Sequence, residues 1–201
     1  MKRISLIIVA SLFLAPTAKA GVLLEPFLGY NLFVQEATTG DGAAPIPSGQ
    51  SIKIDAKGIG FGLRLGYGFK PVFAAFEYST ATLASSLKEA PAGIPFNPSD
   101  VTATTMGVVV GADLMVVRPY VGYIFDDQSK DSNSTMHGNG YKLGVGFGFF
   151  PKVKINLEYH IRTFTKEKDD SGTETAYEQS GVISSVKATG FTIGVSVPFE
   201  F

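Results

Sequence analysis

The sequence predicts an all-β protein, an eight-stranded antiparallel up-and-down transmembrane β-barrel. Apolar side chains alternate with polar residues or glycines in eight segments, and the connections between these segments are short and long in turn. No run of 18 apolar residues follows the N-terminal region, which excludes spanning by helices. Because successive side chains of a strand point to opposite faces, an unbroken apolar row indicates lipid on one face and a lumen on the other.

The first four segments each place a charged residue or glycines on the predicted inner face. In chain order they cover residues 22–35, 60–69, 72–78 and 106–111. The first turns Glu25 inward, the second turns Arg64 inward among four glycines, and the third turns Glu77 inward. A slip of one residue in the second or fourth segment would exchange its two faces.

The last four segments cover residues 118–123, 141–149, 153–162 and 190–201. Their inner faces are predicted to carry Arg118, Lys142 and, from the third of them, alternating polar side chains. This third segment has the clearest pattern, with Val153, Ile155, Leu157, Tyr159 and Ile161 facing outward and Lys154, Asn156, Glu158, His160 and Arg162 facing inward. The last segment keeps an apolar row up to the final residue, Phe201.

The connections give a second, independent signal. Residues 70–71, 113–116 and 151–152 are predicted tight turns, whereas residues 37–51, 83–100, 126–139 and 165–184 are predicted long polar loops. Outer-membrane barrels have short periplasmic turns and longer extracellular loops. The charges of the last two loops are predicted to be hydrated at the loop tips.

The N-terminus predicts export. Met1-Lys2-Arg3 is basic, an apolar run follows, and Ala18-Lys19-Ala20 has the small residues of a cleavage site. We therefore expect residues 1–20 to be a cleaved signal peptide and residues 21–201 to form one barrel domain in the outer membrane of a Gram-negative bacterium. Without Lys2, Arg3 and Lys19, 14 basic residues face 18 acidic ones, a net charge of −4 that argues against nucleic-acid binding.

Two motifs carry a resemblance to a known family. Pro26 and Pro119 each begin a Pro-aromatic-apolar-Gly-Tyr run, and the chain ends with aromatic Phe199 and Phe201. Over residues 21–201 the chain resembles small OmpA/OmpX-type outer-membrane β-barrels, as a barrel domain without a peptidoglycan-binding domain. The resemblance implies that Phe199 and Phe201 form a C-terminal signal for the barrel-insertion machinery, although Ser196 stands where the family pattern has glycine.

The inward charges suggest two interpretations of the lumen. They have both signs and are Glu25, Arg64, Glu77, Arg118, Lys142, Lys154, Glu158 and Arg162. Since eight strands leave a space just wide enough for side chains, these charges can pair into a plug that fills the barrel. The alternative is a narrow channel for ions or small solutes, favoured by the inward glycines unless these make room for bulky neighbours across the lumen.

The sequence favours a structural role with surface loops for adhesion or ligand contact. Expected partners are outer-membrane lipids, lipopolysaccharide, the insertion machinery and an extracellular ligand or host surface. A lipid-modifying enzyme is the most distant alternative: His160 with Glu158 and Thr163 would supply its residues, but no serine lies near them in sequence. A lone loop histidine, His137, does not make a metal site. We therefore expect no catalytic, metal or cofactor site.

Overall fold

The computed structural model describes residues 20–42, 47–91, 98–131, 134–150, 152–169, 171–177 and 181–201. Most of the predicted signal peptide lies outside the described residues, and Ala20 begins the first strand. No helix among these residues has the length and apolar character needed to cross a membrane.

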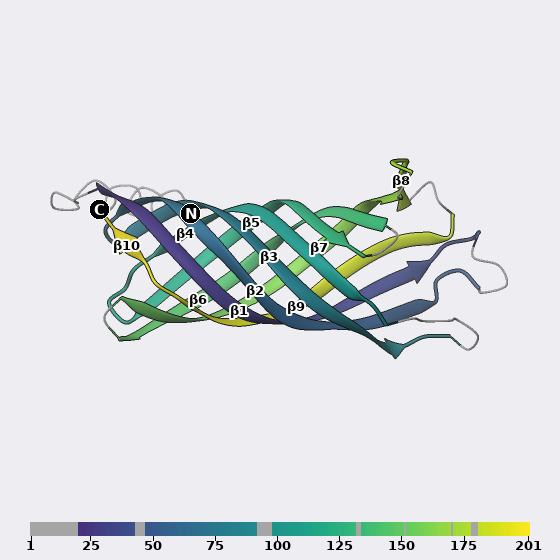
Figure 1. Cartoon of the computed structure of the whole chain (residues 1–201), viewed down its shortest axis with the longest axis horizontal. Helices are drawn as coiled ribbons and strands as arrows, with labels where there is room; N and C mark the ends of the chain where they lie inside the picture. The colour runs from purple at the N-terminus through teal and green to yellow at the C-terminus, as the bar shows by residue number, and fades with distance from the viewer. Residues whose placement is uncertain are drawn as a thin grey trace, which may run out of the picture.

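Within the described residues, eight long antiparallel strands form a closed ring, as predicted (Figure 1). The ring follows chain order from β1 to β7, and β9 then pairs with both β7 and β1. Two short strands extend it, since β8 pairs with β7 and β10 pairs with β1. The strands are β1 (Ala20–Thr39), β2 (Ser51–Phe69), β3 (Val72–Glu89), β4 (Asp100–Ala112), β5 (Val117–Lys130), β6 (Ser134–Phe150), β7 (Val153–Asp169), β8 (Glu174–Ala176), β9 (Ile183–Ser196) and β10 (Phe199–Glu200).

The predicted faces of the strands are confirmed, including those of the second and fourth segments. On β2, Arg64 is 1% exposed, whereas its neighbours Leu63 and Leu65 are 40% and 53% exposed. On β4, Val108 and Val110 face outward and Val109 is buried inside. Because the closed ring pairs every strand on both edges, no backbone edge of the spanning region is left open to lipid.

An apolar belt surrounds the barrel. On β2 it consists of six successive outward side chains from Ile59 to Phe69, each at least 40% exposed. Residues 59–69 number 11, which fits the roughly 9–11 residues that a tilted strand needs to cross a bilayer. Beyond Ile59 the outward positions become charged, beginning with Lys57. The belt therefore ends there, and the rest of β2 extends past the membrane.

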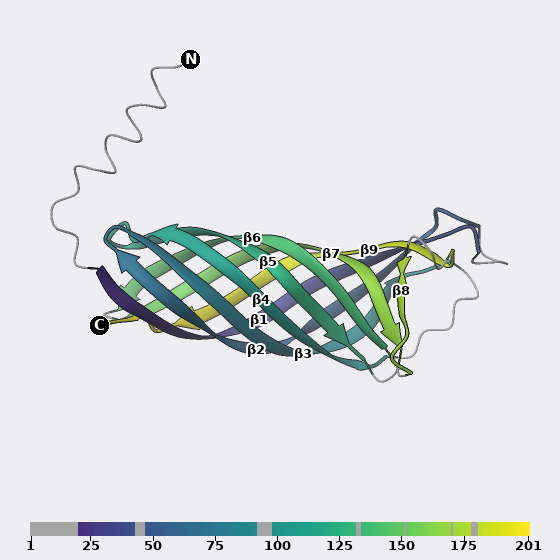
Figure 2. The ribbon, with the colours of Figure 1, turned by 90° about the horizontal axis from the view of Figure 1, so that it is seen from above.

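The two ends of the barrel differ. The start of β1, the C-terminal Phe201 and the turn between β2 and β3 lie at one end, and β8 lies at the other (Figures 1 and 2). Since short turns mark the periplasmic side of outer-membrane barrels, the end with the chain termini is periplasmic and the end with β8 is extracellular.

The predicted long loops are longer than the connections in the structure, because the strands extend into the predicted loop ranges. Strand β1 continues to Thr39, β3 continues to Glu89, and only residues 131–133 separate β5 from β6. These strand ends extend beyond the apolar belt, where water surrounds the outer face and outward residues need not be apolar. The alternation on which the prediction depends therefore fades before the strands end.

A β-bulge hides the end of β5 from sequence reasoning. The register of β5 shifts between Ile124 and Asp127 on the β6 side, so both of these residues face inward. A bulge adds one residue and changes the phase of the alternation that follows it. Asp127 is fully buried, so the prediction that it is a hydrated loop charge is wrong.

The predicted last segment is divided in two. Strand β9 begins earlier than predicted, at Ile183, and ends at Ser196. Val197 and Pro198 interrupt the sheet before β10, and proline has no N–H to donate to a ladder. The backbone of Phe201 nevertheless exchanges two hydrogen bonds with Val22 of β1, at 3.0 and 3.1 Å. The chain end is thus held against the first strand.

Candidate functional site

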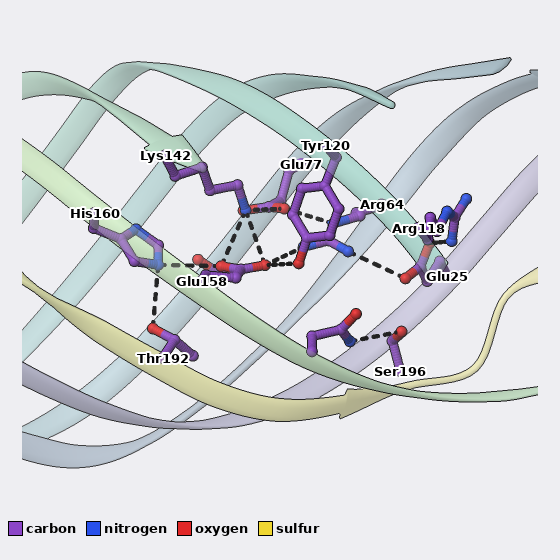
Figure 3. A network of polar contacts seen from close by, with 12 residues as sticks. Glu25, Arg64, Glu77, Arg118, Tyr120, Lys142, Glu158, His160, Thr192 and Ser196 are labelled. Atoms are coloured by element: carbon purple, nitrogen blue, oxygen red, sulfur yellow. Dashed lines mark hydrogen bonds and ion pairs between the residues drawn. The ribbon is translucent and has the colours of Figure 1, made fainter. Parts of the chain in front are cut away.

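A network of charged side chains crosses the lumen, and Arg64 lies at its centre (Figure 3). The Arg64 guanidinium contacts three carboxylates from three strands, those of Glu25 on β1, Glu77 on β3 and Glu158 on β7. Its Nη1 is 3.1 Å from Glu25 Oε1, and its Nε is 2.7 Å from Glu77 Oε2. Antiparallel pairing places Arg64 opposite Glu25 and Glu77, which explains why three distant residues meet.

Two further cations balance these carboxylates. Lys142 on β6 donates to both oxygens of Glu77 and lies 3.4 Å from Glu158 Oε2. Arg118 on β5 donates from Nη1 to Glu25 Oε2 at 2.6 Å. The lumen network, defined as these three cations and three carboxylates, therefore has a formal charge of zero. None of its side chains is more than 8% exposed.

Aromatic rings fill the remaining space around the guanidinium groups. Arg64 lies between the rings of Phe27 and Tyr120, 4.8 and 4.7 Å from their centroids. The Tyr120 hydroxyl donates to Glu158 Oε1 at 2.6 Å. Arg118 stacks 3.7 Å from the centroid of Phe73. Such contacts add cation–π attraction to the ion pairs and exclude water from them.

The inward glycines make room for these rings. A Cβ built on Gly144 would overlap the ring of Tyr120, and a Cβ on Gly62 would overlap the ring of Phe27. The bare faces of β2 and β6 at these positions are therefore covered by bulky side chains from neighbouring strands, and they do not leave open space.

The other two predicted lumen charges pair with aspartates outside the network, and one of these, Asp113, also lies 3.4 Å from Arg118 Nε and so connects Lys154 to the network. Lys154 Nζ is 2.7 Å from Asp113 near the periplasmic turn. Arg162 Nη1 is 3.3 Å from Asp127 on the extracellular side of the network, and its guanidinium lies 4.4 Å from the ring centroid of Phe33.

Sequence reasoning missed three partners of the predicted charges. Asp113 falls in a predicted turn, and Asp127 follows the bulge in β5, so the alternation does not reveal that it faces inward. Tyr120 stood on the inward row but carried no charge. The signal that could have found Tyr120 is its position two residues from Arg118 on the same face, because a buried phenol requires a hydrogen-bond partner.

His160 does not have the geometry of a catalytic base. Its Nε2 lies 3.1 Å from Glu158 Oε2 and 3.2 Å from the Thr192 hydroxyl, so both partners share one ring nitrogen. A triad instead needs the acid on one nitrogen and the nucleophile on the other. Thr163 lies next to inward Arg162 and thus on the outer face. His137, predicted in a loop, lies within β6. Among the described residues, no group of three or more His, Cys, Asp or Glu side chains could hold a metal ion.

Cavities lie on both sides of the network. An open periplasmic mouth of about 620 Å³ is lined by Lys70, Asp113, Lys154 and Glu200. On the other side, a small cavity of about 30 Å³ is bounded by Glu77, Glu158, His160, Thr192 and Arg162, among others. A larger cavity of about 190 Å³ follows toward the extracellular end. The small cavity has room for about one or two waters, so the network and Arg162 separate the larger spaces.

The closed ring, the apolar belt and the filled lumen define a small outer-membrane β-barrel protein. The sequence model described as the outer membrane protein beta-barrel domain matches residues 5–199. The chain therefore belongs to the family of outer-membrane β-barrel domains, and its place is the bacterial outer membrane. Comparison with curated proteins found no match.

Several solved structures are similar to this chain. Neisserial surface protein A is 19% identical, with a TM-score of 0.48, and the match covers 90% of this chain and 99% of that one. OprG from Pseudomonas aeruginosa is 13% identical, with a TM-score of 0.46 and coverage of 92% and 97%. The attachment invasion locus protein Ail of Yersinia pestis is 15% identical, with a TM-score of 0.42 and coverage of 87% and 98%.

Proposed function

We propose that the protein is a sealed structural barrel whose extracellular end makes adhesive or ligand contacts. The observation that carries this proposal is the lumen network, which is neutral, buried and placed at the depth of the membrane centre. Arg64 occupies the middle of residues 59–69, the stretch of β2 that bears the apolar belt. The network therefore closes the lumen where an ion would have to cross.

Direct pairing supports a plug over a pore. A conducting lumen needs a continuous hydrated path, whereas each carboxylate of the network contacts at least two cationic side chains across the lumen. Separating a buried ion pair without replacement partners costs about 3–5 kcal/mol. Opening a path through several such pairs would cost correspondingly more.

The extracellular end supports the surface role. Beyond the belt, Lys53 pairs with Glu89 at 2.7 Å, and Asp55 lies 3.4 Å from Lys57 and 3.5 Å from Lys88. These charges stand on the outer face next to the belt, at the level where lipopolysaccharide head groups would lie. Connections on a rigid scaffold are also where binding tends to develop.

The connection after β7 has an ordered start. The Asp169 carboxylate accepts hydrogen bonds from the Ser171 hydroxyl and from the Thr173 amide, at 2.6 and 2.8 Å. These bonds, with further backbone amides, lower the pKa of Asp169. A turn held by these hydrogen bonds presents its side chains in a fixed arrangement to a binding partner.

Planar-bilayer conductance of refolded residues 21–201 tests the sealed barrel, with Arg64→Ala as the internal comparison. A silent membrane that contains folded protein supports the plug. Discrete openings whose conductance or ion selectivity changes in Arg64→Ala would instead make the protein a channel. The spaces on both sides of the network favour this alternative, since the network and Arg162 lie between the periplasmic mouth and the larger extracellular cavity.

Deletion of an extracellular connection tests the surface role. The strands that flank each connection pair through the region of the apolar belt, so the barrel is expected to stay folded while contact with cells or lipopolysaccharide is lost. Unchanged binding after each connection has been removed in turn would oppose an interaction role for the extracellular end.

Export and insertion are proposed to use residues 1–20 as a signal peptide and Phe199 with Phe201 as the insertion signal.

A further inference from the structure

The cavity of about 190 Å³ lies inside the extracellular half of the barrel and is called here the upper cavity. Six strands each contribute an apolar side chain to its wall, namely Phe33, Ile54, Leu83, Val101, Met136 and Phe164. Ile54 precedes Ile59, the last apolar belt residue on β2, so the upper cavity lies beyond the lipid-facing part of the wall. Water therefore surrounds this part of the barrel, while the interior combines these apolar side chains with polar ones, among them Gln35 and Arg162.

The size of the upper cavity fits one ring. An engineered apolar cavity of about 150 Å³ in another protein stays dry and binds benzene. A space of about 190 Å³ can hold a single six-membered ring with one small substituent. Phe33, Ala103 and Arg162 also line the small cavity beneath, so they form the floor.

Two polar side chains in the wall have donor groups with weak or missing partners. The Gln35 amide nitrogen contacts only the Met136 sulfur among the hydrogen bonds found for it, at 3.5 Å, and a thioether is a weak acceptor. The buried Arg162 Nε has no hydrogen-bond partner among the described residues. The Arg162 Nε is itself inaccessible, so a ligand that accepts a hydrogen bond would gain from the Gln35 amide, whose thioether partner is a weak acceptor.

The charges of the wall select against ions. The Arg162 cation is already paired with Asp127, and Asp131 adds a carboxylate to the lining. A second anion would therefore find the Arg162 cation already neutralised by Asp127, and an ion without a partner of its own is costly to bury.

We propose that the upper cavity is a binding site for a small neutral molecule of single-ring size that carries a hydrogen-bond acceptor. This proposal does not depend on the lumen being sealed, because the site lies on the extracellular side of the network. Aromatic alcohols and similar neutral amphipathic molecules belong to this chemical class.

Methionine methyl groups provide the test. After signal removal the chain has three methionines, and they occupy three environments: Met136 in the upper cavity, Met106 on the outer face and the fully exposed Met115 at a periplasmic turn. The refolded protein, labelled with ¹³C at the methionine methyls, would be titrated with benzyl alcohol and, separately, with benzoate. Met106 reports any uptake of the probe into detergent or lipid at the outer surface.

The expected result is a saturable shift of the Met136 signal by benzyl alcohol, with Met106 and Met115 unchanged. Benzoate is expected to bind at least about tenfold more weakly, since it places a charge in an apolar space. Ala56→Phe, which fills part of the cavity, is expected to abolish the shift, and Ala84→Phe on the exposed face of β3 is expected to preserve it.

Equal shifts at Met136 and Met106, or no shift at Met136, would overturn the proposal. Equal affinity for benzoate would also overturn it, because the site would then select for shape without regard to charge. If Ala56→Phe does not fold, Ala188→Leu provides a second filled cavity, and the comparison of methionines in the unmodified protein stands without either variant.

Discussion

Removal of Arg64 is expected to destabilise the barrel strongly. Arg64→Ala leaves three carboxylates with two cations, and it gives the buried lumen network a net charge of −1. Breaking a buried ion pair by removing one partner costs about 3–5 kcal/mol. This loss is large, since most proteins are stable by only about 5–15 kcal/mol. Urea unfolding of the protein in lipid vesicles at pH 7 would measure it.

A surface ion pair serves as the control. Lys57 lies 3.4 Å from Asp55 and is half exposed, so Lys57→Ala is expected to change the free energy of unfolding by no more than about 1 kcal/mol. The contrast between the two substitutions separates the effect of burial from the loss of a charge.

A second substitution tests whether charge balance is the cause. In Arg64→Ala/Glu77→Gln, two cations again face two carboxylates. The double variant is therefore expected to be more stable than the sum of the single losses predicts, by about 1–3 kcal/mol. A loss of less than about 1 kcal/mol for Arg64→Ala, or two losses that simply add, would contradict a role for charge balance.

Three further outcomes are expected. Gly144→Ala should lower stability by about 1–3 kcal/mol in the same unfolding assay, because its methyl group would overlap Tyr120, whereas Gly148→Ala meets only distant atoms and should be neutral. Because the pKa of Asp169 is lowered, its carboxylate stabilises the turn fully above the ordinary carboxyl pKa. This stabilisation should be lost as the pH falls through the lowered pKa. Hydrogen exchange of the turn amides, such as that of Thr173, would then become faster. Phe201→Ala should reduce assembly in cells but not refolding in detergent, as counted by folded protein in each case.

The membrane-spanning half of the fold could be predicted from the sequence. Lipid on one side and a narrow lumen on the other force a strict alternation, so the faces of residues such as Leu63 and Arg64 follow from the period of two. This alternation alone is enough to predict the eight ring strands and the inward position of the charges.

The extracellular half could not be predicted in the same way. Outside the membrane the outer face of a strand contacts water, so its outward residues need not be apolar. In addition, the bulge before Asp127 shifts the alternation of inward and outward residues, and no residue type in the sequence indicates this shift. Contacts across the lumen also lie beyond sequence reasoning, because the pairing of Arg118 with Glu25 joins residues 93 positions apart. Only the closure of the ring brings them together.

The lumen network also favours the correct strand register. Its six residues come from six different strands, β1, β2, β3, β5, β6 and β7. A slip of one residue in any of these strands would turn its charge from the lumen to the lipid. A lysine or arginine on the lipid face at the bilayer centre costs about 2–4 kcal/mol, and its former partner would stay buried without compensation. A slipped register thus has two energetic costs, a charge in lipid and an unpaired charge in the lumen. A charged lumen therefore stabilises the correct register even in a barrel that conducts nothing.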